Sequence, residues 1–426
     1  MDYWRRYPFE FVPGDPQFCF PAAEGQHPDC ESDTWFLAAE LTGQRGRRFA
    51  FLTIFNKNRP GHAVVADFYT FALFDLDNGA YGTYTDYDMP PASMRRASPK
   101  LSAAQGRLDI SYQSGAGEAV WRSSGEPFAY DVALVGADSA GEPMALRLDV
   151  TPTRAPVPLG GPIFHGKIAC FGQDDTYSYF QTGMTMSGSL HWGSVTEDVR
   201  GTAGHVDRQW FPRYAGGGGT DGDPRARAHE WRTIHLSNGV DLSIWRQFDR
   251  TNRNALLPFS GATTSPPEGE PEFADDIEVD VTSYVRWPEE VRPLVPPLAA
   301  ARYLPDRHRL TSRQLGLDLT GEPLVAAPAH ALPIEYMEGP YRYHGTMGGK
   351  PVSGSAFYER SLGLYRDWEL VDVLATVVDD VGELRTLIRE GRRDEAVEYL
   401  AGVHVHPLVD DLITALRRPI PESPPS

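Results

Sequence analysis

The sequence predicts a mainly β protein, with two antiparallel barrel- or sandwich-like domains followed by a C-terminal helical extension. Short segments rich in aromatic and β-branched residues recur at a spacing of roughly ten residues, with Gly, Asn or Asp between them. The 36 prolines and 41 glycines are spread along the chain as turn residues. With 426 residues, of which 41% are hydrophobic, the chain is long enough to bury two cores.

Taken in order, the chain begins with an irregular arm, residues 1–35, which five prolines interrupt. The strands expected next are Trp35–Leu41, Arg48–Asn56, Val64–Asp75, Leu108–Gln113, Ala119–Arg122, Phe128–Val135 and Met144–Thr151. Two later hairpins are clear, Glu230–Leu236 with Val240–Phe248 and Tyr341–Thr346 with Pro351–Arg360. The first contains Asn238-Gly239, which a type I′ turn prefers, and the second contains Gly348-Gly349.

A segment rich in Pro, Gly and Ser, residues 254–275, is the best candidate for a linker. We therefore predict an N-terminal β domain over residues 1–255, including the arm, and a C-terminal β domain over residues 256–365. Apolar residues then recur at helical spacing from Leu370 to Ile388, and a last amphipathic stretch covers Leu408–Leu416, which predicts a helical tail over residues 366–426. The tail is interpreted as a cap on the second β domain or, alternatively, as a homodimerisation element.

Charge and cysteine content narrow the class of protein. The net charge of −18 repels phosphate backbones and anionic lipids, so nucleic acid and membrane surfaces are poor partners. The three cysteines Cys19, Cys30 and Cys170 include no C-x-x-C pair, and free thiols are favoured over a Cys19–Cys30 bridge. The N-terminus lacks the apolar core of a signal peptide, and no apolar run approaches the roughly 20 residues that span a bilayer. We expect a cytoplasmic protein that is not an integral membrane protein.

The familiar catalytic motifs are absent from the sequence. It contains no Walker A sequence, no G-x-S-x-G elbow and no G-x-G-x-x-G between a strand and a helix. His229 and His235 are six residues apart, unlike the H-E-x-x-H zinc motif, although period two would place them on one strand face. A metal pair there, or at His404 and His406, is disfavoured against ordinary strand histidines. We therefore predict no metal site.

Several motifs occur in an order that resembles a known pattern. They are Tyr179-Phe180-Gln181-Thr182, Ser187-Gly188-Ser189-Leu190, the run from Gly201 to Trp210, the hairpin from His229 to Leu242, Tyr336-Met337-Glu338-Gly339-Pro340 and the run from Val352 to Glu359. Over about residues 15–365 this pattern resembles the lipocalin-like carotenoid 1,2-hydratase (hydroxyneurosporene synthase) and AttH family. The chain departs from it at Gly204-His205 and Phe211-Pro212, so a changed substrate or reaction stays open.

This resemblance implies two lipocalin-like barrels that work without cofactors. Some members of the family hydrate isolated alkenes of isoprenoids, and related proteins are terpenoid cyclases or decalin-forming pericyclases. Hydration or cyclisation of an alkene needs a protonated acid in an apolar pocket and aromatic faces that stabilise a carbocation. Asp207 is the predicted proton donor, and His205 shares its strand face by period two. In the alternative interpretation Asp207 caps a turn and pairs with Arg208 or Arg213.

The remaining candidates would bind the substrate. Trp35, Tyr179, Trp192, Trp210 and Trp231 could supply an aromatic lining, although each taken alone is more often core. Gln181 could orient water or a substrate carbonyl. Tyr336 and Glu338 complete the set, but Glu338, like Glu359, is more often an inter-barrel hydrogen-bonding or salt-bridge residue than a catalyst.

The leading hypothesis is thus a cofactor-independent acid–base enzyme, a hydratase or cyclase, acting on an alkene of a hydrophobic isoprenoid-like molecule. The alternatives are a pericyclase of polyketide or terpenoid biosynthesis and a non-catalytic ligand-binding protein of lipocalin type. The sequence leaves open whether the pocket lies within one barrel or between two.

Overall fold

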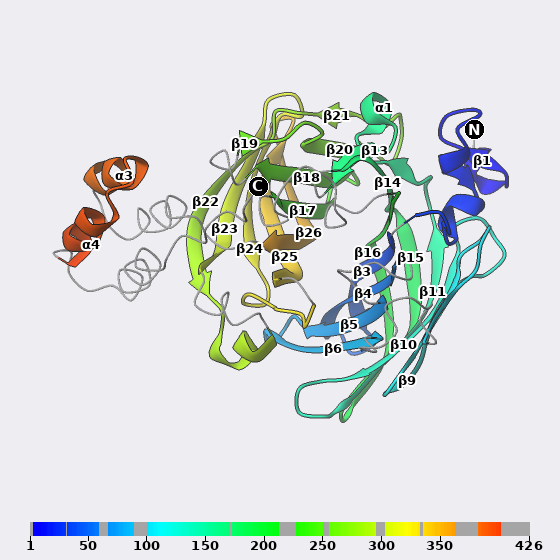
Figure 1. Cartoon of the computed structure of the whole chain (residues 1–426). Helices are drawn as coiled ribbons and strands as arrows, with labels where there is room; N and C mark the ends of the chain where they lie inside the picture. Colours follow the sequence, from blue (N-terminus) through cyan, green and yellow to red (C-terminus); the bar gives the residue numbers. More distant parts are fainter. Residues whose placement is uncertain are drawn as a thin grey trace.

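The computed structural model describes residues 3–30, 32–58, 67–88, 100–170, 173–212, 227–249, 255–294, 303–332, 335–362 and 382–401. Within these ranges the chain forms two large curled antiparallel sheets that lie side by side (Figure 1). The predicted fold class, a lipocalin-like β protein with helices near the C-terminus, is confirmed.

The first sheet has 14 strands within the described residues, and its main path runs β6-β5-β4-β3-β16-β15-β11-β10-β9-β8-β7. These strands are β3 (Ser32–Gly43), β4 (Arg48–Asn58), β5 (Asp67–Asp75), β6 (Ala80–Asp88), β7 (Leu101–Ala103), β8 (Asp109–Ser114), β9 (Gly117–Ser123), β10 (Tyr130–Ala137), β11 (Pro143–Pro152), β15 (Met184–Trp192) and β16 (Val195–Phe211). Beside β16 lies β14 (Gln173–Gln181), which also pairs with β12 (Val157–Pro158) and β13 (Lys167–Cys170). Each strand predicted in this part of the chain is present where the structure describes it.

The second sheet has 10 strands within the described residues, and its main path runs β21-β20-β18-β17-β26-β25-β24-β23-β22. Its strands are β17 (Arg227–Leu236), β18 (Asp241–Asp249), β19 (Ala255–Leu256), β20 (Gly261–Ser265), β21 (Phe273–Ala274), β22 (Glu278–Arg286), β23 (Tyr303–Ser312), β24 (Leu317–Pro323), β25 (Glu335–Met347) and β26 (Lys350–Leu362). Strands β17 and β18, which the sequence-based division groups with the N-terminal domain, hydrogen-bond into this second sheet. The division into domains remains a prediction.

Outside the two sheets the described elements are short. The N-terminal arm contains the 3-10 helices η1 (Tyr3–Arg5), η2 (Pro16–Phe18) and η3 (Ala22–Glu24) and a ribbon of β1 (Phe9–Glu10) with β2 (Cys19–Phe20). Farther along the chain lie α1 (Gly161–Phe164), the 3-10 helix η6 (Glu289–Leu294), α3 (Gly382–Arg389) and α4 (Arg393–Ala401). Helices α3 and α4 fall within the predicted helical tail, whereas Leu408–Leu416, His404 and His406 lie outside the described residues. No helix in the described part of the chain is long and apolar enough to cross a bilayer.

Both predicted hairpins are confirmed, with different turns. Gly348 and Gly349 both have positive φ, 57° and 73°, which is the geometry of a two-residue type I′ turn. In the other hairpin only Gly239 has a positive φ, 87°, and its N–H donates to Leu236 O at 2.9 Å. This is a three-residue turn closed by a left-handed glycine, so the expected type I′ geometry is wrong there, because Asn238 keeps a negative φ.

The two sheets pack back to back through strands that are buried on both faces. Along β5 all nine residues are buried. Phe71 and Leu73 face the core inside the first sheet, whereas Ala72 and Phe74 belong to a cluster that includes Tyr336 and Phe357 of the second sheet. By contrast, β10 and β11 alternate buried and more exposed residues, as strands with one solvent face do. Polar side chains at the centre of this contact, such as Asp207 and Glu338, are therefore removed from water.

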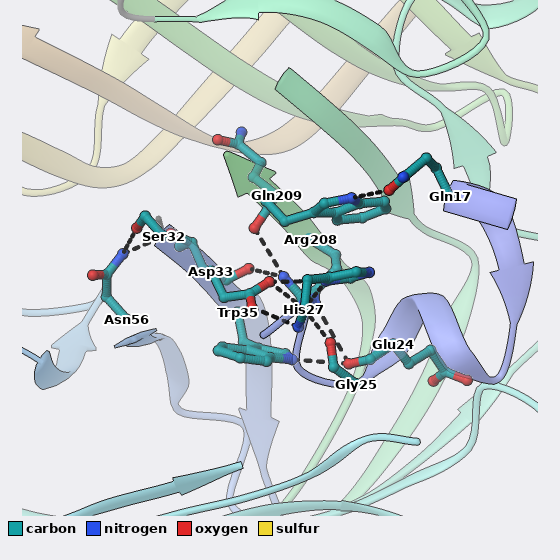
Figure 2. A network of polar contacts seen from close by, with 12 residues as sticks. Gln17, Glu24, Gly25, His27, Ser32, Asp33, Trp35, Asn56, Arg208 and Gln209 are labelled. Atoms are coloured by element: carbon teal, nitrogen blue, oxygen red, sulfur yellow. Dashed lines mark hydrogen bonds and ion pairs between the residues drawn. The ribbon is translucent and has the colours of Figure 1, made fainter. Parts of the chain in front are cut away.

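A buried arginine ties the N-terminal arm to the first sheet (Figure 2). The guanidinium of Arg208 lies 4.0 Å above the Trp35 ring and 2.8 Å from Asp33 Oδ1. It also donates to the backbone carbonyls of Glu24 and Gly25 in the arm. The arm thereby carries the Glu24 carboxyl into the core, where Tyr7 donates to one of its oxygens.

We predict that Glu24 makes folding stability depend on pH. Burial raises the pKa of Glu24 from 4.5 to about 7, although Tyr7, Tyr130 and Arg208 act to lower it. The folded chain therefore holds this proton more tightly than the unfolded chain, and its contribution to stability is lost as pH rises from about 4.5 to about 7. Over this pH range the free energy of unfolding falls by up to ~3 kcal/mol.

Replacing Glu24→Gln should reduce the change of the free energy of unfolding with pH (the slope) and make the variant more stable than the parent at pH 8. Urea unfolding at pH 5 and pH 8 measures the effect. The control is Glu118→Gln, at an exposed carboxyl on β9, which should leave the slope unchanged. Equal slopes for the parent and Glu24→Gln would contradict the assignment.

Candidate functional site

Strand β16 separates two sets of side chains. Its even residues Val206, Arg208 and Trp210 face the core inside the first sheet, and His205, Asp207 and Gln209 alternate with them. The ring of His205 lies 6.0 Å from the Phe357 ring, which belongs to the second sheet. The shared face of His205 and Asp207 is therefore turned toward the second sheet, and Figure 2 shows Gln209 pointing away from the network around Arg208.

A small cavity lies where β16 and β3 meet β17, β25 and β26. It is lined by Phe36, His205, Trp231, Thr233, Glu338, Phe357 and Glu359. The first two side chains come from the first sheet and the others from the second, so the cavity lies between the two sheets. The centre of a water-sized sphere can occupy about 10 Å³ of it, which is about the room that one water molecule needs.

Asp207 is 3% exposed and lies next to this cavity without lining it. Gln209 Nε2 donates to Asp207 Oδ2 at 3.0 Å, and Ser178 Oγ donates to Oδ1 at 3.4 Å. Burial, followed by the charge of Glu359, raises the pKa of Asp207 well above its usual range. The alternative pairing with Arg208 is not formed, because Arg208 points to the opposite face and pairs with Asp33; Arg213 lies outside the described residues.

Two glutamates from the second sheet complete a group of three carboxyls. Glu338 on β25 and Glu359 on β26 are directly opposite in register. Tyr336 OH donates to Glu338 Oε2 at 2.6 Å, and His229 Nε2 lies 2.7 Å from Glu359 Oε1. Burial and then the charge of Glu359 raise the pKa of Glu338 well above its usual range, and Asp207 adds to the effect.

These carboxyls cannot all be ionised together. Like charges brought close in a dry site raise one another's pKa values, so the group retains protons at neutral pH. Asp207 and Glu338 have the raised pKa values, and the charge of Glu359 contributes to both. The site therefore combines protonated carboxyls with a glutamate that contacts a histidine, which are the parts of a general acid–base pair.

Apart from Thr233, the remaining cavity walls are aromatic. The Phe36 ring stacks on His205 with centroids 5.3 Å apart, and Trp231 Nε1 donates to Ser243 Oγ at 2.8 Å, which fixes its ring. Burial, and then His235, lowers the pKa of His205 well below its usual value. His205 Nδ1 has no hydrogen-bond partner among the described residues. A neutral imidazole and aromatic walls thus surround the carboxyls.

The structure divides the predicted site residues into three places. His205, Trp231 and Glu338 line the inter-sheet cavity, and Asp207 and Tyr336 lie behind them, Tyr336 as a hydrogen-bond donor to Glu338. The others do not line it: Trp35, Tyr179 and Trp210 lie in the core of the first sheet, where Gln181 accepts a hydrogen bond from Tyr130 OH at 3.2 Å, and Trp192 Nε1 donates to Asp138 Oδ2 at 2.9 Å. Trp35, Tyr179 and Trp210 lie around Arg208 and the arm, whereas Trp192 lies at the far end of β15.

The two β17 histidines have separate partners. His229 contacts Glu359, and His235 Nδ1 lies 3.2 Å from Asp241 Oδ1. In the parts of the chain that the structure describes, no group of three or more His, Cys, Asp or Glu side chains is arranged to hold a metal ion. Cys19 forms no disulfide with Cys30, so the bridge that the sequence disfavoured is not present.

Sequence reasoning missed several cavity residues. Thr233, which lines the cavity, and His229, which contacts Glu359 behind it, could have been found, because they are two residues on either side of Trp231 on the same strand face. Glu359 is cross-strand from both Trp231 and Glu338, a relation that depends on register and is invisible in one sequence. Phe36 and Phe357 carry no signal that separates them from core phenylalanines.

Comparisons with known proteins agree with this architecture. A candidate AttH of Nitrosomonas europaea is 17% identical, with a TM-score of 0.59 over 84% of this chain and 100% of that chain. Kievitone hydratase of Nectria haematococca is 15% identical, with a TM-score of 0.57 over 80% of this chain and 93% of that chain. At these identities the likeness concerns the fold. A comparison with curated proteins finds no significant match.

The family assignment follows from the sequence itself. The model of the AttH-like family matches residues 12–360, which cover both sheets as far as Arg360 in β26. This agrees with the order of motifs found along the chain. The chain belongs to the AttH-like family.

Proposed function

We propose that this chain is a cofactor-independent enzyme that protonates an alkene of a hydrophobic, isoprenoid-like small molecule between its two sheets, leading to hydration or cyclisation. The observation that supports the proposal most is the group of buried carboxyls, Asp207, Glu338 and Glu359, beside aromatic walls. A structural neighbour named as a hydratase is consistent with it.

In this proposal Glu338, which lines the cavity, delivers the proton to one alkene carbon, and Asp207 is the buried acid that replenishes it. Trp231 and the two cavity phenylalanines stabilise the cation on the other carbon, each contributing up to ~2 kcal/mol. In hydration a water molecule adds to that carbon, and Glu359 with His229 takes its proton. In cyclisation a second alkene attacks instead, and the same base removes a proton from carbon.

The size of the cavity bears on substrate entry. It has room for about one water molecule, so a hydrocarbon chain must displace side chains or separate the sheets locally.

The alternatives, a pericyclase or a non-catalytic binding protein, make no use of a protonated carboxyl. A homodimer through the helical tail stays a separate prediction.

The reaction can be identified with heavy water. Farnesol, geraniol and acyclic polyenes are incubated with the full chain in H2O and D2O, and products are analysed by mass spectrometry. Hydration places one deuterium on carbon and one on oxygen, cyclisation places one on carbon, and a pericyclic reaction incorporates none. Conversion of a polyene without deuterium would reject the acid role and favour a pericyclase.

Replacing Asp207→Asn or Glu338→Gln should lower the turnover of any substrate found by roughly 100- to 10,000-fold, the usual worth of a general acid. Binding of the same substrate should change little, because both amides keep the shape of the carboxyls. The control is Trp192→Phe, which alters a predicted residue that does not line the cavity, and it should retain turnover. Unchanged turnover in both carboxyl variants would exclude the proposed acid.

A further prediction needs no substrate. A carboxyl whose pKa is raised in the folded state contributes stability at low pH that is lost as pH rises above its ordinary value of 4.5. The Glu338→Gln variant keeps an acceptor for Tyr336 but never ionises. Its melting temperature should therefore fall less than the parent's between pH 5 and pH 9.

The matched control for this measurement is Glu322→Gln on β24, where the side chain is 41% exposed. It should follow the parent at every pH. If Glu338→Gln also follows the parent, Glu338 is ionised in the folded state, and the proposed proton delivery fails.

A further inference from the structure

The main chain around the proposed acid Glu338 is held on one side by a loop. Strand β24 pairs with β25 as far as Pro323. Toward the start of β25, residues 328–332 take the place of that strand, and Glu338 N–H donates to Pro328 O at 3.2 Å. The loop runs so close to β25 that a Cβ added at Gly339 would lie 2.3 Å from Pro328 Cγ. The position of Glu338 is therefore set by this loop as well as by β26.

His330 in the loop joins Glu338 to the first sheet. Its imidazole is 0% exposed, with Nε2 2.8 Å from Glu338 O and Nδ1 2.9 Å from Thr83 Oγ1 on β6. A carbonyl oxygen only accepts, so Nε2 carries the proton and donates to it. Burial lowers the pKa of His330 to about 4, so the ring is neutral near pH 7 and Nδ1 accepts from the Thr83 hydroxyl.

Two tyrosines attach the same loop to β6, which ends the main path of the first sheet. Ala329 N–H donates to Tyr81 OH at 3.0 Å, and Tyr81 OH donates to Ala329 O at 3.2 Å. Tyr87 OH donates to Ala331 O. Tyr81 and Tyr87 lie on one face of β6 by period two. These contacts, together with those of His330, form a latch between the first sheet and the loop.

The latch bears on Glu338 because the chemistry of this carboxyl depends on contact between the sheets. Burial, the charge of Glu359 and the charge of Asp207 raise the pKa of Glu338. These conditions last only while β25 stays packed against the first sheet. A hydrocarbon that enters the cavity must displace side chains or separate the sheets locally. A point at which β25 stays joined to β6 keeps the acid in place during that movement.

We infer that His330 is a positioning residue for Glu338, which holds the proposed acid against the first sheet by joining its main chain to Thr83. The inference rests on the proposed function and adds to it a residue that does not line the cavity. The amide of glutamine carries a donor and an acceptor in an arrangement similar to that of a neutral imidazole. His330→Gln can therefore replace both hydrogen bonds, whereas His330→Leu replaces neither.

The test follows the protonation of Glu338 in the full chain by infrared difference spectroscopy between pH 5 and pH 10. The band of a protonated carboxyl that Glu338→Gln removes identifies the group. In His330→Leu the pH at which this carboxyl ionises should fall by about one pH unit or more, because water reaches a loosened β25 and favours the charged form. In His330→Gln it should return to the parent value.

Thr83→Val and Thr85→Val provide a matched pair on β6. Each removes one hydroxyl, but Thr85 Oγ1 contacts Thr70 Oγ1 at 3.1 Å within the first sheet, whereas Thr83 contacts His330. Thr83→Val takes the donor away from His330 Nδ1 and should lower the pH at which Glu338 ionises. Thr85→Val should leave that pH as in the parent. An equal fall in both variants would show a general effect of lost stability and overturn the inference.

With any substrate that the chain converts, kcat of His330→Leu should fall about tenfold or more at unchanged KM, and His330→Gln should restore it. A carboxyl that ionises at the parent pH in folded His330→Leu overturns the inference alone. A parent without a band that depends on Glu338 rejects the proposed acid as well, so the two failures are distinguishable. If His330→Leu does not fold, the comparison of Thr83→Val with Thr85→Val decides.

Discussion

The structure depends on the burial of one set of strands on both faces. The alternating side chains of β3, β4, β5, β16 and β17 fill the core inside their own sheet on one side and the contact between the sheets on the other. This back-to-back packing explains the runs of apolar residues in β4 and β5. It also means that a polar side chain on the outer face of β16 or β17 can be shielded from water, because the other sheet covers that face.

Desolvation then determines the chemistry of those polar residues. An Asp or Glu on a solvent-facing strand ionises at its ordinary pKa, but Asp207 and Glu338 are held between two apolar layers beside another carboxyl. The proposed acid therefore depends on the second sheet as much as on its own strand. The hydrogen bonds from Gln209 and Tyr336 orient these carboxyls.

Inside each curl, a buried arginine has the complementary role. Arg208 in the first sheet and Arg232 in the second each lie over an aromatic ring, at 4.0 Å from Trp35 and 4.1 Å from Tyr358. Each follows in sequence a residue that faces the other sheet: Arg208 follows Asp207, and Arg232 follows Trp231. Their partners differ: Arg208 is satisfied by Asp33 and by carbonyls of the arm, whereas Arg232 shares Glu230 with two other arginines.

The sequence by itself determined the β class, both hairpins and the family, because period-two alternation, turn residues and short motifs are local properties. Only the tertiary structure decided that Trp35, Tyr179, Gln181 and Trp210 lie inside the first sheet while Trp231 and Glu338 line the inter-sheet cavity. It also brought Glu359 opposite Glu338 and beside His229. The physical reason is that a strand pattern shows which residues share a face, but the face that meets a second sheet depends on long-range pairing and packing.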